Sequence, residues 1–388
     1  MRRCLLKTRV RYCSSRVGPL ECKAAVAWKK GGDLKVERVV VEAPMVGEVR
    51  IKLVSASICH TDIWVWSGED RGMMAPFPMI LGHEGAGVVE AVGDGVENIK
   101  IGDKVVPCGL PHCGECVMCS HKKGHGCVHF SRSDSLAAAK PRYRVQDKVV
   151  YPLMSLGTFS EYIVVPSRQV AVVGDSTRLE SVSPVGCAVL TGWGAAEVVG
   201  GVEPGCAVVV YGVGAVGLCT VMACKQAGAR IIIAVDLNKQ KLEMARECGA
   251  THVLISDKNT SAQVKKITRG GADFGFECTG VQRVVGQAVD SLHPGRGEAV
   301  LVGCPPITDK INIMALPFIL QGLTMKGSLM GGWKNSLTAI PKLVEGYMEH
   351  GVPDISKLIT REIKLEDVDQ AFRDMHKGCD ELRIKINY

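Results

Sequence analysis

Hydrophobic and polar positions follow two different patterns along this chain. Between about residues 22 and 173, short apolar runs separated by glycine and proline recur, for example at 48–54, 84–92 and 104–107. Apolar runs of this length that end at turn-forming residues are typical of β-strands. We therefore expect the first part of the chain to form an irregular, largely β lobe.

From about residue 200 to 332, strand-like apolar runs alternate with helical stretches such as 237–248. The predicted strands are 207–211, 230–235, 253–255, 274–277 and 298–302. Strands separated by helices predict βαβ units and therefore a parallel sheet. A helical stretch at 336–350 and a strand-like one at 382–386 follow, and we expect this last segment to return to the first lobe.

One uncharged stretch, from Pro204 to Cys224, is about long enough to span a bilayer. Three glycines at 212, 214 and 217 interrupt it, with β-branched residues before them and small helix-forming residues after them. A strand, a turn and a buried helix explain this pattern better than one membrane span. We expect no membrane partner.

The composition fits this two-part organisation. Of 388 residues, 46% are hydrophobic and 22% are charged, with 44 glycines. These proportions exclude disorder as the main state and are typical of a soluble α/β protein with many tight turns. The length corresponds to about two to three domains.

The net charge of +7 comes mostly from the N-terminus, where no acidic residue precedes Glu21. A basic, serine-containing start predicts either a mitochondrial transit peptide or an untargeted extension of a cytoplasmic protein. The remainder is nearly neutral, so we expect no basic groove and no nucleic-acid partner. The basic residues of the extension are Arg2, Arg3, Lys7, Arg9, Arg11 and Arg16.

The chain has 17 cysteines, an odd number, and no secretory signal pattern, so thiols or metal ligands are expected rather than disulfides. Four of them, Cys113, Cys116, Cys119 and Cys127, form a C-x2-C-x2-C-x7-C pattern. Four thiolates can close a tetrahedral shell around a structural Zn²⁺, and an Fe–S cluster uses the same sulphurs. Surplus donors lie nearby, so the pattern alone does not decide which four bind. They are Cys108, His112, His121 and His125.

A glycine motif, Gly212-x-Gly214-x-x-Gly217, follows the predicted strand 207–211 and opens a predicted helix. In this context the glycines permit a tight turn, close approach of a pyrophosphate and tight packing of helix on strand. Asp236 ends the next predicted strand, where its carboxylate can bind the adenosine ribose hydroxyls and repel a 2′-phosphate. The motif predicts a dinucleotide site that favours NAD over NADP.

A second group of metal-ligand candidates is scattered along the chain. Their separation in the sequence does not show whether these segments lie together in the fold. Each cysteine or histidine could also be a packed side chain of the core. The segments are Cys59-His60-Thr61-Asp62, Gly82-His83-Glu84 and Gly186-Cys187.

In their order and spacing, these segments together resemble the zinc-dependent medium-chain alcohol dehydrogenases, over residues 22–388. The resemblance implies an α/β fold in which a GroES-like, mainly β catalytic domain is combined with a Rossmann domain, a doubly wound parallel sheet. The implied domains are an N-terminal extension (1–21), the catalytic domain (22–188), the Rossmann domain (189–331) and a return to the catalytic domain (332–388).

The resemblance also implies cofactors and chemistry. Cys59, His83 and Cys187 would bind a catalytic zinc, and the four-cysteine group a structural one, so each chain would hold two zinc ions and NAD. The implied reaction is hydride transfer between an alcohol or aldehyde and NAD. The implied assembly is a homodimer joined through the Rossmann domains, across 301–320.

Further roles are implied residue by residue. Thr61 would carry the departing proton, Asp62 would orient the zinc ligand, and Glu84 would be a carboxylate near the metal. Nucleotide contacts are implied for His60 and Arg383 with the pyrophosphate, Lys241 with the adenosine ribose and Thr191 with the nicotinamide.

Within this family, the chain is most similar to class III, the glutathione-dependent formaldehyde dehydrogenases. The likeness is carried by residues 22–28, 59–62, 81–87 and 331–334. It implies that the substrate is S-hydroxymethylglutathione and that the role is formaldehyde detoxification.

Several specificity positions depart from class III. Asp70 matches an acidic residue that binds glutathione, but Gly72 replaces a glutamate, and Arg132 stands one place later than the expected arginine. Gly109 replaces a pocket aromatic, and Trp64 stands where ethanol-active relatives have a proton-relay histidine. Two alternatives therefore stay open: a general alcohol or aldehyde dehydrogenase without glutathione dependence, and a non-catalytic zinc-binding protein that kept the fold.

Overall fold

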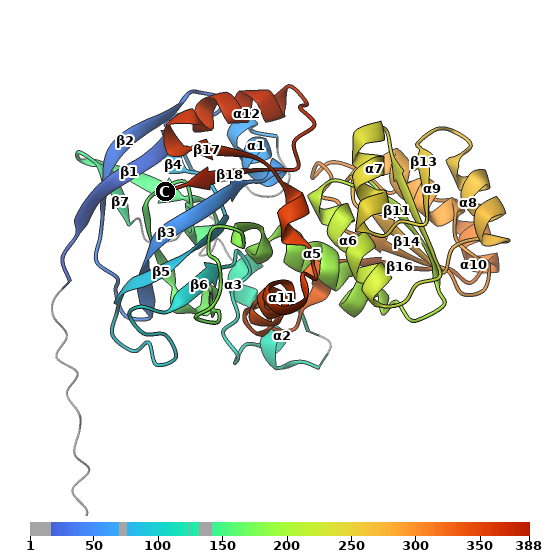
Figure 1. Ribbon diagram of the computed structural model, residues 1–388, viewed down its shortest axis with the longest axis horizontal. Helices are drawn as coiled ribbons and strands as arrows, with labels where there is room; N and C mark the ends of the chain where they lie inside the picture. Colours follow the sequence, from blue (N-terminus) through green and yellow to red (C-terminus); the bar gives the residue numbers. More distant parts are fainter. Residues whose placement is uncertain (1–16, 70–75, 123, 132–141) are drawn as a thin grey trace, which may run out of the picture.

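The computed structural model describes residues 17–69, 76–122, 124–131 and 142–388. The basic N-terminal residues up to Arg16, together with Asp70, Gly72 and Arg132, lie outside the described residues. Figure 1 shows two lobes side by side, one made mainly of β-strands and one in which helices cover a sheet.

The β lobe contains a small closed barrel in the strand order β1-β2-β7-β8-β4. Its strands are short because turns interrupt the apolar runs, and their inward side chains, such as Val39 and Tyr143, are fully buried. The barrel strands are β1 (Leu20–Ala27), β2 (Leu34–Val41), β4 (Met79–Ile80), β7 (Tyr143–Val145) and β8 (Lys148–Pro152).

Beside the barrel lies a seven-stranded sheet in the order β10-β6-β5-β3-β18-β17, with β9 paired to β3. Its strands are β3 (Glu48–Ile58), β5 (Glu84–Val92), β6 (Lys104–Pro107), β9 (Tyr162–Pro166), β10 (Val170–Val172), β17 (Ile359–Lys364) and β18 (Arg383–Asn387). Short helices around this lobe are α1 (His60–Ser67), α2 (Val117–Ser120), α3 (Val128–Ser131) and α12 (Val368–His376).

The C-terminal segment completes the β lobe. Strand β18 pairs antiparallel with β3 and parallel with β17, so it lies inside the sheet and not at its edge. Ile384 and Ile386 are fully buried there. The last residues of the chain therefore pack against residues near its start.

The second lobe contains a six-stranded parallel sheet in the order β13-β12-β11-β14-β15-β16. In chain order this is the 3-2-1-4-5-6 arrangement of a doubly wound nucleotide-binding sheet. The strands are β11 (Ala207–Tyr211), β12 (Ile231–Asp236), β13 (His252–Ile255), β14 (Phe274–Glu277), β15 (Glu298–Leu301) and β16 (Thr324–Gly327). The helices are α6 (Ala215–Gln226), α7 (Lys239–Cys248), α8 (Thr260–Thr268), α9 (Gln282–Asp290) and α10 (Ala315–Leu320).

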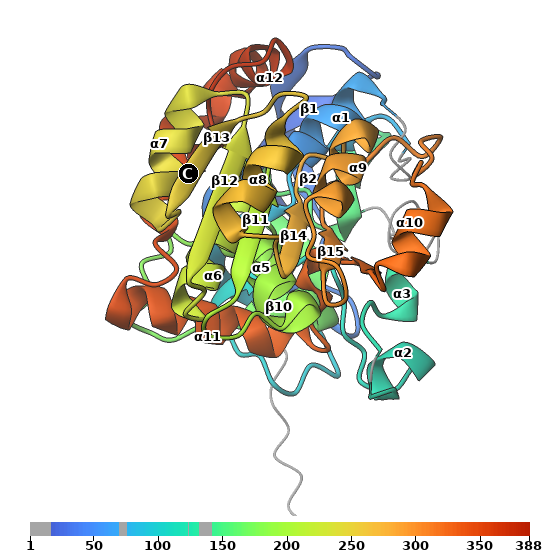
Figure 2. The same ribbon diagram turned by 90° about the vertical axis from the view of Figure 1, so that its right-hand side faces the viewer.

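Helices cover both faces of this sheet, with α6 and α7 on one side and α8 and α9 on the other (Figures 1 and 2). Burial on both faces of the sheet explains why the sequence of strand β11 is continuously apolar. Val208 and Val210 are buried in the cluster that contains α6 and α7, whereas Val209 and Tyr211 are buried in the cluster that contains α8 and α9. A strand buried on both faces needs apolar residues at every position.

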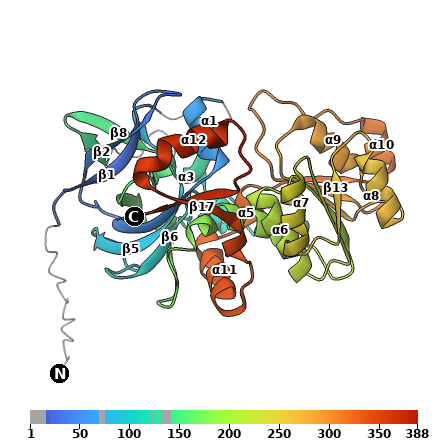
Figure 3. The same cartoon turned by 45° about the horizontal axis from the view of Figure 1, so that its top comes forward.

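Two helices, α5 (Ala188–Gly194) and α11 (Ser336–His350), lie where the lobes meet (Figures 1 and 3). A π-helical turn, Ala195–Gly200, extends α5. One hydrophobic cluster joins Val106 of the β lobe, Leu190 of α5, Val210 of the parallel sheet and Ile340 of α11. The two lobes therefore share a continuous core.

The predicted α/β fold class, a mainly β lobe combined with a doubly wound parallel sheet, is confirmed. The uncharged stretch that starts at Pro204 forms β11, the glycine turn and α6, as expected. None of the helices in the described residues is both long enough and apolar enough to cross a bilayer.

Candidate functional site

Three segments that are far apart in the sequence meet near the start of α5. One ligand atom each from Cys59, His83, Glu84 and Cys187 lies within 4.8 Å of the others. All of these residues are buried except Cys187, which is partly buried. Two thiols and one imidazole at this spacing are a donor set that suits Zn²⁺ and leave room for a fourth ligand.

Both thiols stand at the beginning of a helix. Cys59 is the N-cap residue of α1, directly after β3, and Cys187 is the N-cap residue of α5. The positive end of a helix dipole favours the thiolate form that a metal requires. A hydrogen bond with Cys187 and the nearby Arg383 charge lower the pKa of Cys59 well below its ordinary value, although burial opposes this shift.

The imidazole of His83 is held by a buried carboxylate. Asp62 Oδ1 lies 2.9 Å from Nδ1 of His83 and also accepts a hydrogen bond from the Gly82 backbone N–H at 3.1 Å. Asp62 Oδ2 accepts a bond from the Cys59 backbone N–H at 2.9 Å. The other ring nitrogen of His83, Nε2, is buried and has no hydrogen-bond partner among the described residues. A buried nitrogen with an unshared electron pair beside two thiols fits a metal ligand.

A buried arginine lies behind these ligand candidates. Arg383 Nε donates to both carboxylate oxygens of Glu84, at 3.0 and 2.9 Å, and Nη2 contacts the sulphur of Cys59 at 3.3 Å. Arg383 Nη1 donates to the Leu382 carbonyl at 2.9 Å. Burial raises the pKa of Glu84, and the Arg383 charge opposes that rise. All three guanidinium nitrogens thus have protein partners, and the expected pyrophosphate contact of Arg383 stays a prediction.

The other expected residues of this region lie on the two helices that begin at the thiols. His60 and Thr61 are the first residues of α1, where His60 is exposed and Thr61 is half-buried. Thr191 lies one turn into α5, and its backbone N–H donates to the Cys187 carbonyl at 2.9 Å. Thr61 and Thr191 are therefore close in sequence and in space to the two thiols.

The four-cysteine group folds into a second compact set of donors. The sulphurs of Cys113, Cys116, Cys119 and Cys127 all lie within 4.8 Å of one another. Cys113 and Cys119 are 4.0 Å apart and Cys116 and Cys127 are 3.8 Å apart, measured between sulphurs. A tetrahedral zinc with Zn–S bonds of about 2.3 Å sets the sulphur–sulphur distance at about 3.8 Å.

This spacing decides between the alternatives for the four-cysteine group. A cluster of several irons spreads its cysteine sulphurs farther apart than a single tetrahedral ion does, so the geometry favours one zinc. Backbone N–H bonds from Val128 and Cys119 lower the pKa of Cys116 to about 6, which favours its thiolate. Cys108 is not part of the set; it is buried, and burial raises the pKa of its thiol.

The glycine motif lies between β11 and α6, at the point where the strand order of the parallel sheet reverses. Dinucleotides bind at such a switch point. A Cβ at Gly214 would meet no atom within 4 Å, whereas a Cβ at Gly217 would lie 1.9 Å from the Gly212 carbonyl oxygen. Gly214 thus leaves open space in front of the N-terminus of α6, and Gly217 lets the helix approach the turn. This geometry fits a bound pyrophosphate.

Asp236 ends β12 beside the glycine turn. Its Oδ2 accepts a hydrogen bond from the Val213 backbone N–H at 2.8 Å, and its Oδ1 accepts one from the Asn238 backbone N–H at 2.9 Å. Lys241 lies in the first turn of α7 and is half-buried. Asp236 thus contacts the turn that would receive the nucleotide, and Lys241 lies on the helix that follows Asp236 in the chain.

Two features of the site have no signal in the sequence. The first is the contact of Glu84 with Arg383, since these residues meet only after folding. The second is Met154, which has a positive φ of 52°. A Cβ at Gly109 would lie 2.9 Å from the Met154 sulphur, so Met154 fills the space that a larger side chain at position 109 would need.

Comparison with known proteins agrees with this geometry. The sequence model of the alcohol dehydrogenase GroES-like domain family matches residues 46–175. That of the zinc-binding dehydrogenase family matches residues 215–345. The alcohol dehydrogenase class-3 of Myxine glutinosa is 38% identical over 366 residues, which cover 92% of this chain and 96% of that protein.

Solved structures show the same fold over nearly the whole chain. An alcohol dehydrogenase zinc-binding domain protein from Burkholderia ambifaria is 32% identical with a TM-score of 0.88, and covers 95% of this chain and 99% of its own. The benzyl alcohol dehydrogenase of Acinetobacter calcoaceticus is 31% identical with a TM-score of 0.86, at the same coverage. Sequence, domain matches and fold together show that this chain belongs to the zinc-dependent medium-chain alcohol dehydrogenase family.

Proposed function

We propose that this NAD-dependent zinc alcohol dehydrogenase oxidises S-hydroxymethylglutathione, with Cys59, His83 and Cys187 as the ligands of its reacting zinc. The ligand assignment rests on Nε2 of buried His83, which lies beside both thiols and has no hydrogen-bond partner within the part of the chain that the structure describes. The substrate assignment is supported by the class III resemblance and by the 38% identity with a class-3 enzyme.

When bound, zinc supplies a Lewis acid for the alcohol oxygen, and NAD supplies the acceptor for the hydrogen and electron pair that leave the alcohol carbon. The residues of the chain prepare this step. Asp62 accepts the hydrogen bond from Nδ1 of His83, so the proton stays on Nδ1 and Nε2 keeps its electron pair for the metal.

The proton of the alcohol needs a separate path. Thr61 stands in the first turn of α1, and its hydroxyl can both accept and donate a proton. Trp64 follows one turn later, but an indole N–H is a donor only and cannot take the proton onward. We assign Thr61 as the protein group that passes the proton, with water or a cofactor hydroxyl as its next acceptor.

A second candidate substrate class is an ordinary alcohol without glutathione. It is favoured by Gly72 and by the shifted Arg132, which depart from the class III pattern, and by the likeness to a benzyl alcohol dehydrogenase at 31% identity. Met154 fills the space beside Gly109. The apolar wall at this point therefore differs from that of relatives that have an aromatic residue in place of Gly109.

We propose that the protein is a homodimer joined through the parallel-sheet lobe. Helix α10 exposes large apolar side chains, with Leu316 at 65% and Leu320 at 76% exposure. Strand β16 beside it pairs only with β15 among the described strands. Exposed apolar side chains next to an edge strand that is unpaired on its outer side among the described strands support association of two copies.

Removing one ligand from each of the two proposed zinc sites should have different effects, on activity in one case and on stability in the other. Cys187→Ala should lower kcat/KM by about a thousandfold or more, because it removes a ligand of the ion that polarises the alcohol. Cys116→Ala should instead lower the midpoint of thermal unfolding by about 10 °C, because a structural zinc contributes to folding. Each variant should hold about one zinc per chain by elemental analysis, against about two in the parent.

Cys108→Ala is the matched control, since Cys108 is a buried cysteine outside both donor sets; its zinc content and activity should equal those of the parent. Full turnover by Cys187→Ala, or an unchanged unfolding midpoint for Cys116→Ala, would contradict the assignments. A single zinc in the parent protein would favour the non-catalytic alternative.

Coenzyme preference should depend on Asp236. Asp236→Asn removes a negative charge that would face the 2′-phosphate of NADP, so kcat/KM with NADP should rise by about tenfold or more relative to that with NAD. Initial rates with both coenzymes measure this ratio. Asp175→Asn, at an exposed position in the β lobe, should leave the ratio unchanged. An equal ratio in both variants would show that Asp236 does not face the ribose.

Glutathione dependence distinguishes the two substrate classes. NADH formation from NAD and formaldehyde should require glutathione, because only its free thiol forms the hydroxymethyl adduct. S-Methylglutathione, which has no free thiol, is the matched control and should give no rate. If benzyl alcohol is oxidised well and glutathione makes no difference, the ordinary alcohol class replaces the class III assignment.

The dimer proposal predicts a mass near twice the chain mass of 41.6 kDa by light scattering after size exclusion. The double change Leu316→Lys and Leu320→Lys should give monomers, because it places charges in the apolar interface. Leu237→Lys changes an equally exposed leucine, at 72%, outside α10 and should leave the mass unchanged. A monomeric parent would refute the proposal.

A further inference from the structure

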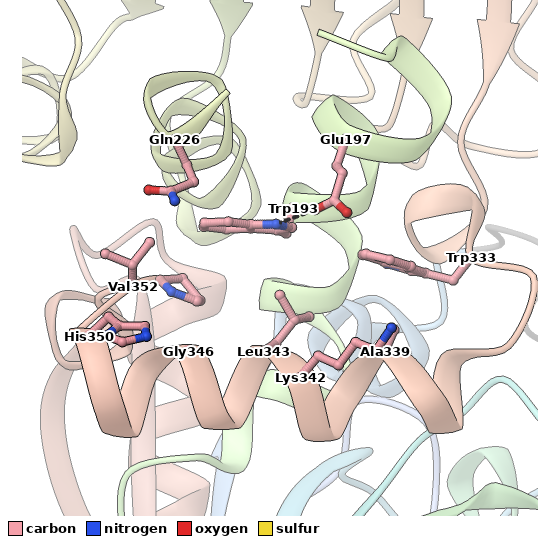
Figure 4. Close-up of a pocket in the computed structure, with 11 residues that line it drawn as sticks. Trp193, Glu197, Gln226, Trp333, Ala339, Lys342, Leu343, Gly346, His350 and Val352 are labelled. Carbon is pink, nitrogen blue, oxygen red and sulfur yellow. Dashed lines mark hydrogen bonds between the residues drawn. The ribbon is translucent and has the colours of Figure 1, made fainter. Parts of the chain in front are cut away.

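Helix α7 of the parallel-sheet lobe is bonded to the β lobe at both of its ends. At its start, Nδ2 of Asn238 donates a hydrogen bond to Oδ1 of Asp380, in the turn between α12 and β18. At its end, Nζ of Lys357, in the turn before β17, donates to the Glu247 carbonyl at 3.2 Å. The neighbouring helix α6 ends instead at a groove of about 360 Å³ between Gln226 and α11 (Figure 4). The junction is thus hollow at the end of α6 and bridged by polar contacts at α7.

Asn238 uses both ends of its side-chain amide at the start of α7. Its Oδ1 accepts hydrogen bonds from the backbone N–H groups of Gln240 and Lys241, at 2.8 and 3.1 Å, and so caps the helix. Its own backbone N–H donates to Oδ1 of Asp236 at 2.9 Å. Asp236 and Asp380 therefore contact the same asparagine, one through its backbone and the other through its side chain. Two carboxylates from different lobes meet at this point.

Without Asp380, the start of α7 would be a favourable place for an anion. The N-terminal end of a helix carries a partial positive charge, and phosphates commonly bind there. Lys239 and Lys241 add two positive charges in the first turn. The exposed carboxylate of Asp380 places a negative charge at the same end of the helix and opposes the attraction of an anion.

The other charged residues of the 377–382 turn lie near a different ion pair. The bond between Arg361 and Asp374 lowers the pKa of Asp374 and raises the pKa of Arg361, and the charges of Lys377 and Glu381 add to these two shifts. Both side chains are therefore close to the Arg361–Asp374 pair, which belongs to the β lobe. In the part of the chain that the structure describes, Asp380 is the charged residue of this turn whose side chain bonds the parallel-sheet lobe.

We infer that Asp380 is a second coenzyme-specificity residue, which acts together with Asp236 against the 2′-phosphate of NADP. The inference rests on the proposed placement of the adenosine ribose at Asp236. A 2′-phosphate replaces a hydroxyl that would lie against the Asp236 carboxylate, so it would enter the space beside Asn238, where the charge of Asp380 repels it. The lysines do not change the sign of this effect, because a charged Asp380 makes the potential at the start of α7 more negative with or without them.

Asp380→Asn tests the charge without removing the hydrogen bond, because an asparagine oxygen can still accept from Nδ2 of Asn238. The dissociation constants of NAD and NADP are measured by calorimetry with the full chain. Asp380→Asn should lower the ratio of the NADP constant to the NAD constant by about threefold, the scale of one exposed charge interaction. Asp380→Lys reverses the charge and should lower this ratio by about tenfold.

Glu247→Gln is the matched control. Glu247 is also an exposed acidic residue of α7 in contact with the β lobe, but it lies about 13–14 Å from Asn238 along the helix axis. This variant should leave the ratio unchanged. Salt gives a second readout, because exposed charges are screened: the effect of Asp380→Asn should be clear at about 50 mM salt and nearly absent at about 0.5 M. A purely structural change would persist at both.

Asp236→Asn, measured in the same way, separates this inference from the proposal on which it rests. A lower ratio for Asp236→Asn but not for Asp380→Asn would overturn the role of Asp380 and keep the ribose at Asp236. Equal ratios in the parent and in both variants would overturn the inference and the ribose placement together. An effect of Asp380→Asn that Glu247→Gln reproduces, or that is the same at both salt concentrations, would also overturn the inference.

Discussion

The carboxylate of Asp62 is the group on which the proposed zinc site depends. It is fully buried, and it binds Nδ1 of His83 and the backbone N–H groups of Cys59 and Gly82. A buried carboxylate without such partners would cost several kcal/mol. By satisfying this one group, the fold ties the start of α1 to the turn before β5 and holds the imidazole of His83 beside the two thiols.

The shared core explains how this site meets the nucleotide lobe. Helix α5 starts at the thiol of Cys187 and packs against α6, whose first turn follows the glycine motif. The same hydrophobic cluster extends from Val106 in the β lobe to Val210 in the parallel sheet. The proposed metal ligand and the proposed nucleotide turn are therefore attached to neighbouring helices, and close packing of those helices would set the relative position of the two reactants.

A strand from near the C-terminus also contributes a residue to the site. Strand β18 lies between β3 and β17, and this position carries Arg383 to the sulphur of Cys59 and to Glu84. Because Arg383 and Glu84 are both almost fully buried, each charge requires the other. A residue near the end of the chain therefore supplies the charge that pairs with Glu84 beside the candidate ligands.

Local pattern was sufficient for the strands at 84–92, 207–211 and 274–277 and for the helix at 336–350, because apolar periodicity and turn residues act over a few positions. It was also sufficient to place the glycine motif between a strand and a helix and to mark the four cysteines as metal-ligand candidates, whereas the choice of these four and of a single ion depended on their distances in the structure. The meeting of Cys59, His83 and Cys187, the pairing of Arg383 with Glu84, and the filling of the space at Gly109 by Met154 were decided only by the tertiary structure. These contacts join residues separated by long stretches of chain, and no local preference encodes which distant strands and helices pack together.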